Sequence, residues 1–143
     1  MNAKQLDSAG LGMLTGLLRE NHLPYQDLTL TGNIFMTFSE GDQLVGAGGL
    51  ELYRPYALLR SVVVTDRYRG QGKGQAIVAG LIAKAKQESI THVYLLTETA
   101  HDFFAKLGFK DIVRENVPVE VSAASEFTTV CPVSAACMQL EIQ

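Results

Sequence analysis

A glycine-rich turn between an apolar strand and a helix is the feature that most constrains this chain. The turn reads RGQGKG from Arg69 to Gly74; it follows the apolar run Ala57 to Val64 and precedes a helical stretch, Gln75 to Glu88. Glycine lets the backbone approach a bound anion closely, and the first N–H groups and positive dipole end of the helix point at the same place. The sequence therefore predicts a site for a phosphate-bearing ligand, without indicating which one.

The segments around this turn form a strand–helix–strand unit. The helical stretch carries apolar residues on one face, as expected for a helix lying on a sheet: Ile77, Val78, Leu81, Ile82 and Ala85. The segment His92 to Leu96 follows as the next strand. A strand, a crossover helix and a second strand give a parallel pair, and the many apolar residues of the first strand predict a central, buried position.

The flanking segments predict further helices and strands. A helix begins after Ser8 as N-cap, carries leucines at helical spacing and ends before Pro24. Asn33–Glu40 and Gln43–Tyr53 read as a hairpin. Within its second strand, Gly46, Gly48 and Gly49 indicate a bulge or a close backbone approach.

The C-terminal third gives weaker patterns. Thr99 and Asp102 resemble a capping box for a helix from Ala100 to Leu107, which Gly108 would close. The remaining predictions are two weak strands and a short helix between them: Phe109–Glu115, Ala136–Ile142 and Ser122–Phe127.

Composition narrows the class of protein. The length of 143 residues predicts one domain, spanning residues 1–143. A net charge of −3 and a pI near 5.6 disfavour a nucleic-acid binder. Apolar runs are too short to span a bilayer, and the first residues are too polar for a secretory signal, so we expect a cytoplasmic protein that binds no membrane.

The order of these elements, with two motifs, resembles the GNAT superfamily of acyl-CoA-dependent N-acetyltransferases. Arg69, Gly72 and Gly74 meet the family pattern Gln/Arg-x-x-Gly-x-Gly/Ala. A second signature, an aromatic pair followed by Gly-Phe, is met by the run FFAKLGF over 103–109. The resemblance implies an α/β (α+β) fold, with a mixed central sheet of about six to seven strands flanked by about four helices.

A narrower likeness is to the short N-acetyltransferases associated with bacterial arsenic-resistance gene clusters. It lies in the segments Leu58–Ser61 and Tyr94–Thr97, and in Glu126 and Phe127 followed by the run CPVSAACM over 131–138. This likeness suggests an amino-acid-like or arsenical amine as substrate.

The family resemblance implies acetyl-CoA as co-substrate. The backbone N–H groups of Gly70, Gln71, Gly72, Lys73, Gly74 and Gln75 would hold its pyrophosphate, with positive charge added by Arg69 and Lys73. Val62, Val63 and Val64 would pair with the pantetheine arm like an added strand. A backbone N–H near Val62 would then polarise the thioester carbonyl, and Phe104 would pack near the sulfur.

Transfer by direct attack requires a neutral amine, so a base is useful. Glu51, which ends a strand facing the expected cleft, is the first candidate base, and Glu98, after the strand beside the cofactor, is the second; solvated loop carboxylates are the alternative for both. Phe104 stands where many family members carry a proton-donating tyrosine, so the thiolate would leave unprotonated or take a proton from Thr97, Thr99 or water. A place in the core is the alternative for Phe104.

Three residues are predicted to bind the acceptor amine: Arg60, Ser61 and Thr97. Arg60 interrupts an apolar strand and needs a partner; it would bind a substrate carboxylate bidentately or form an internal ion pair with Glu51 or Glu98.

The two cysteines, Cys131 and Cys137, invite a soft-metal or arsenite site, although buried structural cysteines fit this apolar segment better. No histidine has metal-ligand spacing, so no metal site is predicted. The leading function is an N-acetyltransferase acting on a small-molecule amine, and the family resemblance also suggests a homodimer. The alternatives are a non-catalytic acyl-CoA-binding module and a thiol-based arsenite or metal sensor.

Overall fold

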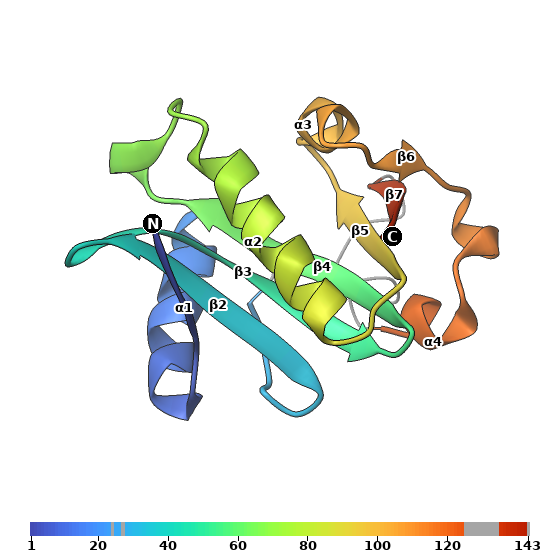
Figure 1. Ribbon diagram of the computed structural model, residues 1–143, viewed down its shortest axis with the longest axis horizontal. Coiled ribbons are helices and arrows are strands. Elements are labelled where there is room, and N and C mark those ends of the chain that lie inside the picture. Colours follow the sequence, from blue (N-terminus) through green and yellow to red (C-terminus); the bar gives the residue numbers. More distant parts are fainter. Residues whose placement is uncertain (24, 27, 125–134, 143) are drawn as a thin grey trace.

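The computed structural model describes residues 1–23, 25–26, 28–124 and 135–142. They form one mixed sheet of seven strands with four α-helices (Figure 1). The α-helices are α1 (Ser8–Glu20), α2 (Lys73–Gln87), α3 (His101–Lys106) and α4 (Val119–Ser122). The strands are β1 (Asn2–Gln5), β2 (Asn33–Glu40), β3 (Gln43–Tyr53), β4 (Tyr56–Val64), β5 (His92–Thr97), β6 (Lys110–Asp111) and β7 (Ala136–Glu141). Two short 3₁₀ helices, η1 (Asp66–Tyr68) and η2 (Arg114–Asn116), complete the description.

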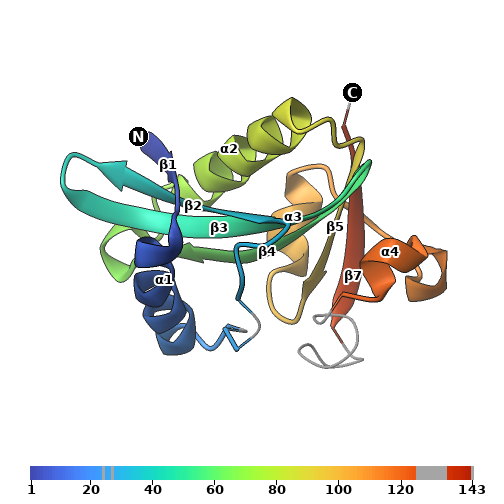
Figure 2. The same cartoon turned by 90° about the horizontal axis from the view of Figure 1, so that it is seen from below.

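The sheet order is β1-β2-β3-β4-β5-β7-β6, which places β4 at the centre. Strands β1 to β4 are antiparallel neighbours, and β4 and β5 form the parallel pair around α2. The predicted strand–helix–strand unit and the central position of its first strand are therefore confirmed. Figure 2 shows α2 on one face of strands β2 to β4 and α1 on the other.

The apolar face of α2 packs closely on β3, where the glycines make room for it. A Cβ on Gly46 would lie 2.5 Å from Ile77 Cδ1 of α2, and one on Gly48 would lie 2.4 Å from Leu81 Cδ1. The register of β2 against β3 also shifts beside Gly46. The glycines of β3 thus mark both a bulge and a close approach, as predicted.

The two strands of the parallel pair separate along their length. Pairing between β4 and β5 runs only from Tyr56↔His92 to Leu58↔Tyr94. Beyond that point β5 pairs only with β7, through to Thr97, while β4 continues beside β3 to Val64. The carboxyl-terminal halves of β4 and β5 therefore diverge, as the family resemblance implied for the cofactor strand.

Several predicted boundaries are corrected. The N-cap of α1 is Asp7 rather than Ser8, and its carboxylate accepts from the Gly10 N–H at 3.1 Å. The predicted capping box of Thr99 and Asp102 is absent: α3 makes no side-chain cap, and Thr97 Oγ1 instead accepts from the Ala100 N–H. Asp7 satisfies free helical N–H groups as well as Ser8 would, so pattern alone could not separate them.

The edges of the sheet also differ from the prediction. Strand β1 was not predicted, because its residues are polar; all four are exposed on the edge of the sheet. Only Lys110–Asp111 of the predicted strand Phe109–Glu115 pairs, with β7. Of the predicted helix Ser122–Phe127, Ser122 is the last residue of α4 (Val119–Ser122), Ala123 and Ala124 follow that helix, and residues 125–127 lie outside the described part of the chain. Pro24, Glu126 and Phe127 lie outside the described residues.

Candidate active site

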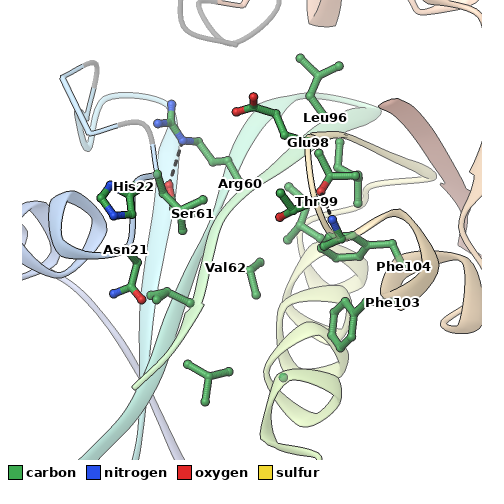
Figure 3. Close-up of a pocket in the computed structure, with 18 residues that line it drawn as sticks. Asn21, His22, Arg60, Ser61, Val62, Leu96, Glu98, Thr99, Phe103 and Phe104 are labelled. Carbon is green, nitrogen blue, oxygen red and sulfur yellow. Dashed lines mark hydrogen bonds between the residues drawn. The ribbon is translucent and has the colours of Figure 1, made fainter. Parts of the chain in front are cut away.

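A cavity of about 610 Å³ lies where β4 and β5 diverge (Figure 3). Its floor and walls come from the carboxyl-terminal half of β4, the end of β5, the start of α3 and the turn after α1. Ten of the residues predicted to bind or react line it: Arg60, Ser61, Val62, Val63, Val64, Gly74, Thr97, Glu98, Thr99 and Phe104. The structure therefore brings together residues from β4, α2, the end of β5 and α3, which are far apart in sequence.

A bulge in β4 shapes the centre of this cavity. Ala47 of β3 lies opposite Val63, but Gly49 lies opposite Arg60, so β4 carries one more residue than β3 over this stretch. Ser61 accommodates the extra residue with φ 62°, in the left-handed region. Such a bulge bends the strand and interrupts its ladder of hydrogen bonds, which directs the backbone around Val62 toward the opening between β4 and β5.

The glycine-rich turn borders a second cavity of about 340 Å³, which shares Val64, Gly74 and Phe103 with the first. Gly70 and Gly72 both have φ 75°, and Gly72 is the N-cap of α2. The predicted turn geometry is therefore present: a left-handed turn leads directly into the first N–H groups of a 15-residue helix, while phosphate binding there stays a prediction. The two cavities are therefore neighbours, one at the turn and the other where β4 and β5 diverge.

The two cations of the turn have protein partners. Lys73 Nζ lies 2.6 Å from Glu40 Oε2, and this hydrogen bond lowers the pKa of the Glu40 carboxyl. Arg69 donates from Nε to the Val64 carbonyl oxygen at 3.0 Å and pairs through Nη1 with Asp66 at 2.5 Å. Lys73 lines the second cavity beside Tyr68, whose ring lies 5.9 Å from its Nζ.

Arg60 and Glu51 form a buried ion pair on the sheet. Arg60 Nη1 donates to Glu51 Oε1 at 2.7 Å, and Tyr53 donates its hydroxyl to Glu51 Oε2 at 2.7 Å. Arg60 Nε also donates to Ser61 Oγ at 3.0 Å. Both carboxylate oxygens are thus engaged, and Glu51 does not line the cavity, whereas Arg60 does. Of the two alternatives weighed for Arg60, the internal pair with Glu51 is present.

The end of β5 carries the polar side chains of the opposite wall. Glu98 is exposed on the cavity wall, and it has no hydrogen-bond or ion-pair partner among the residues that the structure describes. Thr97 Oγ1 accepts from the Ala100 N–H at 2.9 Å, which leaves its own hydroxyl hydrogen available. Figure 3 shows Arg60 and Glu98 near the same end of the cavity.

Phe104 is buried on the cavity wall, with 8% of its surface exposed. Its ring meets Phe103 edge-on at a centroid distance of 5.0 Å and Phe109 at 5.5 Å. Phe104 is therefore both a member of the core and a lining residue, and it supplies an apolar surface with no proton to donate.

The turn after α1 lines the cavity and was not predicted to do so. Asn21, His22 and Leu23 form this part of the wall. They follow the helix C-terminus at a distance of about forty residues from the other lining segments, and no motif marks them. The positive φ of His22, 59°, is visible only in the structure.

Of the two cysteines considered for a soft-metal or arsenite site, Cys131 lies outside the described residues. Cys137 is buried in β7 between β5 and α4, and burial raises the pKa of its thiol. Among the described residues, no three His, Cys, Asp or Glu side chains are grouped to hold a metal ion. Nor does any described helix have the length and hydrophobicity to cross a membrane.

Comparison with known proteins identifies the fold and the family. Residues 15–109 match the model of the Acetyltransferase (GNAT) family. The chain belongs to this family. The match runs from the second half of α1 to the residue before β6 and so includes the turn, the divergent strands and the aromatic signature.

Individual GNAT relatives are similar over part or all of the chain. An uncharacterised N-acetyltransferase of Chlorobaculum tepidum is 28% identical over 99 residues, which are 68% of this chain and 61% of the relative. The amino-acid acetyltransferase of Mycobacterium tuberculosis is 37% identical over 81 residues, 55% of this chain and 45% of that enzyme. The chain thus matches about half to three fifths of these relatives.

Among solved structures, the Mycobacterium tuberculosis protein Rv2747, crystallised with CoA, superposes with a TM-score of 0.78. It is 21% identical, and the alignment covers 100% of both chains. The mixed sheet and the four helices described above are therefore those of a GNAT domain.

Proposed function

We propose that this chain is an N-acetyltransferase that moves an acetyl group from acetyl-CoA to a primary amine of a small molecule. The observation that carries the proposal is the divergence of β4 and β5 beside a glycine turn at the N-terminus of α2. In a member of the GNAT family, this arrangement sets an anion cradle beside a strand edge that β5 leaves unpaired, and the cavities that the two border share Val64, Gly74 and Phe103.

The residues present fit coenzyme A. The left-handed glycines and the free N–H groups from Gly70 to Gln75 suit a pyrophosphate, and Lys73 lies in the same cavity. The freed edge of Val62 to Val64 suits an extended amide-bearing arm, which would add to the sheet as another strand. Phe104 would then contact the sulfur end of that arm. When bound, acetyl-CoA supplies the activated acetyl group.

The chain's own residues would orient and deprotonate the amine. The attacking nitrogen forms a bond to the acetyl carbon as the carbon–sulfur bond breaks, and the amine proton passes to a base. Of the two predicted carboxylates, the geometry favours Glu98, because it lines the cavity while both oxygens of Glu51 are engaged. The backbone N–H near Val62 would stabilise negative charge on the thioester oxygen. The departing thiolate would receive a proton from Thr97, Thr99 or water.

Acceptors with an anionic group fit best. Arg60, Ser61 and Thr97 line the cavity, and Glu51 holds the Arg60 guanidinium in one orientation. An amino acid or an amino-acid analogue combines the amine with such a group, and one relative is named as an amino-acid acetyltransferase. The narrower sequence likeness extends this class to arsenic-containing analogues, and thus to arsenic resistance. A cytoplasmic location and a homodimer stay predictions from the sequence.

Release of free thiol from acetyl-CoA, measured against a panel of amines, tests the proposal. The panel contains amino acids, the phosphorus analogue phosphinothricin, polyamines and aminoglycosides, and mass spectrometry identifies the acetylated product. We expect acceptor-dependent release with amino-acid-type amines. Binding of acetyl-CoA without release for any amine would instead favour the non-catalytic module, which Phe104 supports because it cannot protonate a thiolate.

A further inference from the structure

Arg69 connects three segments of the chain through its guanidinium group. Besides the Val64 carbonyl oxygen at the end of β4 and the Asp66 carboxylate in η1, its Nη2 donates to Asn21 Oδ1. Asn21 lies 48 positions earlier, at the C-terminal end of α1. The arginine of the glycine-rich turn therefore reaches the opposite wall of the larger cavity.

Asn21 is placed to receive this contact. It is the C-cap of α1, and its Nδ2 donates to the Leu17 carbonyl oxygen at 2.8 Å while its Oδ1 accepts from Arg69. The side-chain amide thus uses one end to satisfy a free carbonyl of the helix terminus and the other to hold the arginine.

The next two residues complete the wall of the cavity. His22 adopts φ 59°, and its N–H donates to the Arg19 carbonyl oxygen at 3.2 Å. The Leu23 N–H returns to the Leu18 carbonyl oxygen at 3.0 Å, which closes the turn. Figure 3 shows Asn21 and His22 on the side of the cavity opposite Phe103 and Phe104, with Val62 between them.

We propose that Arg69 is a positioning residue, which holds the wall formed by Asn21, His22 and Leu23, and that it is not a phosphate ligand. The inference rests on the proposed function in taking the larger cavity as the acceptor site. The contact between Arg69 and Asn21 does not depend on that function. Three protein acceptors already occupy Nε, Nη1 and Nη2 of Arg69. The cradle then holds phosphate through its backbone N–H groups and Lys73, while Arg69 shapes the acceptor side.

Amide hydrogen exchange of the unliganded chain tests this role directly. The variants Arg69→Ala and Asn21→Ala should each speed exchange of the His22 and Leu23 amides by about fivefold or more, and the double variant should add little. Asn21→Asp keeps an oxygen that can accept from Arg69 but loses the donor to the Leu17 carbonyl oxygen, so its exchange should lie between that of the unaltered chain and that of Asn21→Ala. Arg67→Ala is the matched control: Arg67 is exposed, donates to Gln43 at 3.0 Å, and lines neither cavity. Unchanged exchange in Arg69→Ala and Asn21→Ala would overturn the proposal.

Calorimetric titration with acetyl-CoA separates the two roles of Arg69. A positioning role predicts that Arg69→Ala and Asn21→Ala bind acetyl-CoA equally well, within about twofold of the unaltered chain. A tenfold or greater loss in Arg69→Ala alone, on the order of one phosphate contact, would identify a phosphate ligand and overturn the proposal. Neither hydrogen exchange nor calorimetry requires turnover. A result that overturns the role of Arg69 is therefore distinct from a failure of the transferase function.

Discussion

Arg60 Nη1 lies 2.7 Å from Glu51 Oε1, with 1% and 6% of the two side chains exposed. The two residues are diagonal neighbours across β4 and β3, since Glu51 lies opposite Leu58 and Gly49 lies opposite Arg60. The two charges lie beneath the cavity. Because both are buried, their attraction offsets part of the free energy that each loses when it is removed from water. Glu51 therefore reads as the partner that orients Arg60.

This pair predicts a large effect on stability when one partner is removed. Glu51→Ala removes a buried carboxylate that pairs with the buried guanidinium and should lower the free energy of unfolding by about 3–5 kcal/mol. The double variant Glu51→Leu with Arg60→Met should recover most of that loss. Urea unfolding followed by circular dichroism measures both. Equal losses in the single and double variants would show that the two side chains are not coupled.

Glu98 is expected to control the rate of transfer. Glu98→Gln removes the one carboxylate that lines the described part of the cavity, and should lower kcat by about 10²–10⁴-fold. The KM for acetyl-CoA should change little. Glu51→Gln is the matched control, since it also removes one negative charge; it should lower kcat far less. A larger loss of kcat in Glu51→Gln than in Glu98→Gln would assign the base to Glu51 instead.

Sequence reasoning located the cofactor side of this site better than the acceptor side. The turn from Arg69 to Gly74 carries its geometry in its glycines, because few other residues adopt φ near 75°. Arg60 was flagged since a charge within an apolar strand needs a partner. The wall at Asn21 and His22 gave no such signal, because only the packing of α1 against the sheet brings it to the cavity.

The fold was predictable where hydrophobic periodicity is strong. The helix after the turn and the central strand β4 each bury a regular apolar pattern. The exposed edge strand β1 has no such pattern and depends on backbone pairing with β2 alone. The two-residue strand β6 is likewise set by its neighbour β7 rather than by its own sequence.

The glycine at the N-cap of α2 is expected to be essential for cofactor binding. Gly72→Ala should cost about 1–2 kcal/mol of stability, because alanine disfavours the left-handed backbone. If the turn relaxes to avoid this strain, the acetyl-CoA Kd should rise by about tenfold. Gly32→Ala is the control: Gly32 has φ 71°, similarly open surroundings and a position outside both cavities. Its stability loss should match, with an unchanged Kd; equal Kd values for both variants would contradict a cradle at Gly72.

His101 should make the stability of the chain depend on pH. Hydrogen bonds to Asp102 and Asp111 raise the pKa of its imidazole in the folded state. A raised folded pKa stabilises the fold below the unfolded value of about 6.5, and this contribution is lost as the pH rises through the folded pKa. His101→Gln should therefore lower Tm relative to the unaltered chain at about pH 5.5, below the titration range of the imidazole, but not at about pH 9, above it. A difference in Tm that is the same at both pH values would contradict this reading.

Titration of the unaltered chain with acetyl-CoA by calorimetry tests the central claim most directly. The claim is that the divergence of β4 and β5 and the glycine turn form one site for this molecule. We expect a single site per chain with a Kd on the order of micromolar. The Kd for acetyl-CoA should be lower than the Kd for its pantetheine arm alone, because that arm lacks the pyrophosphate. The absence of binding at concentrations up to about 1 mM would contradict the account.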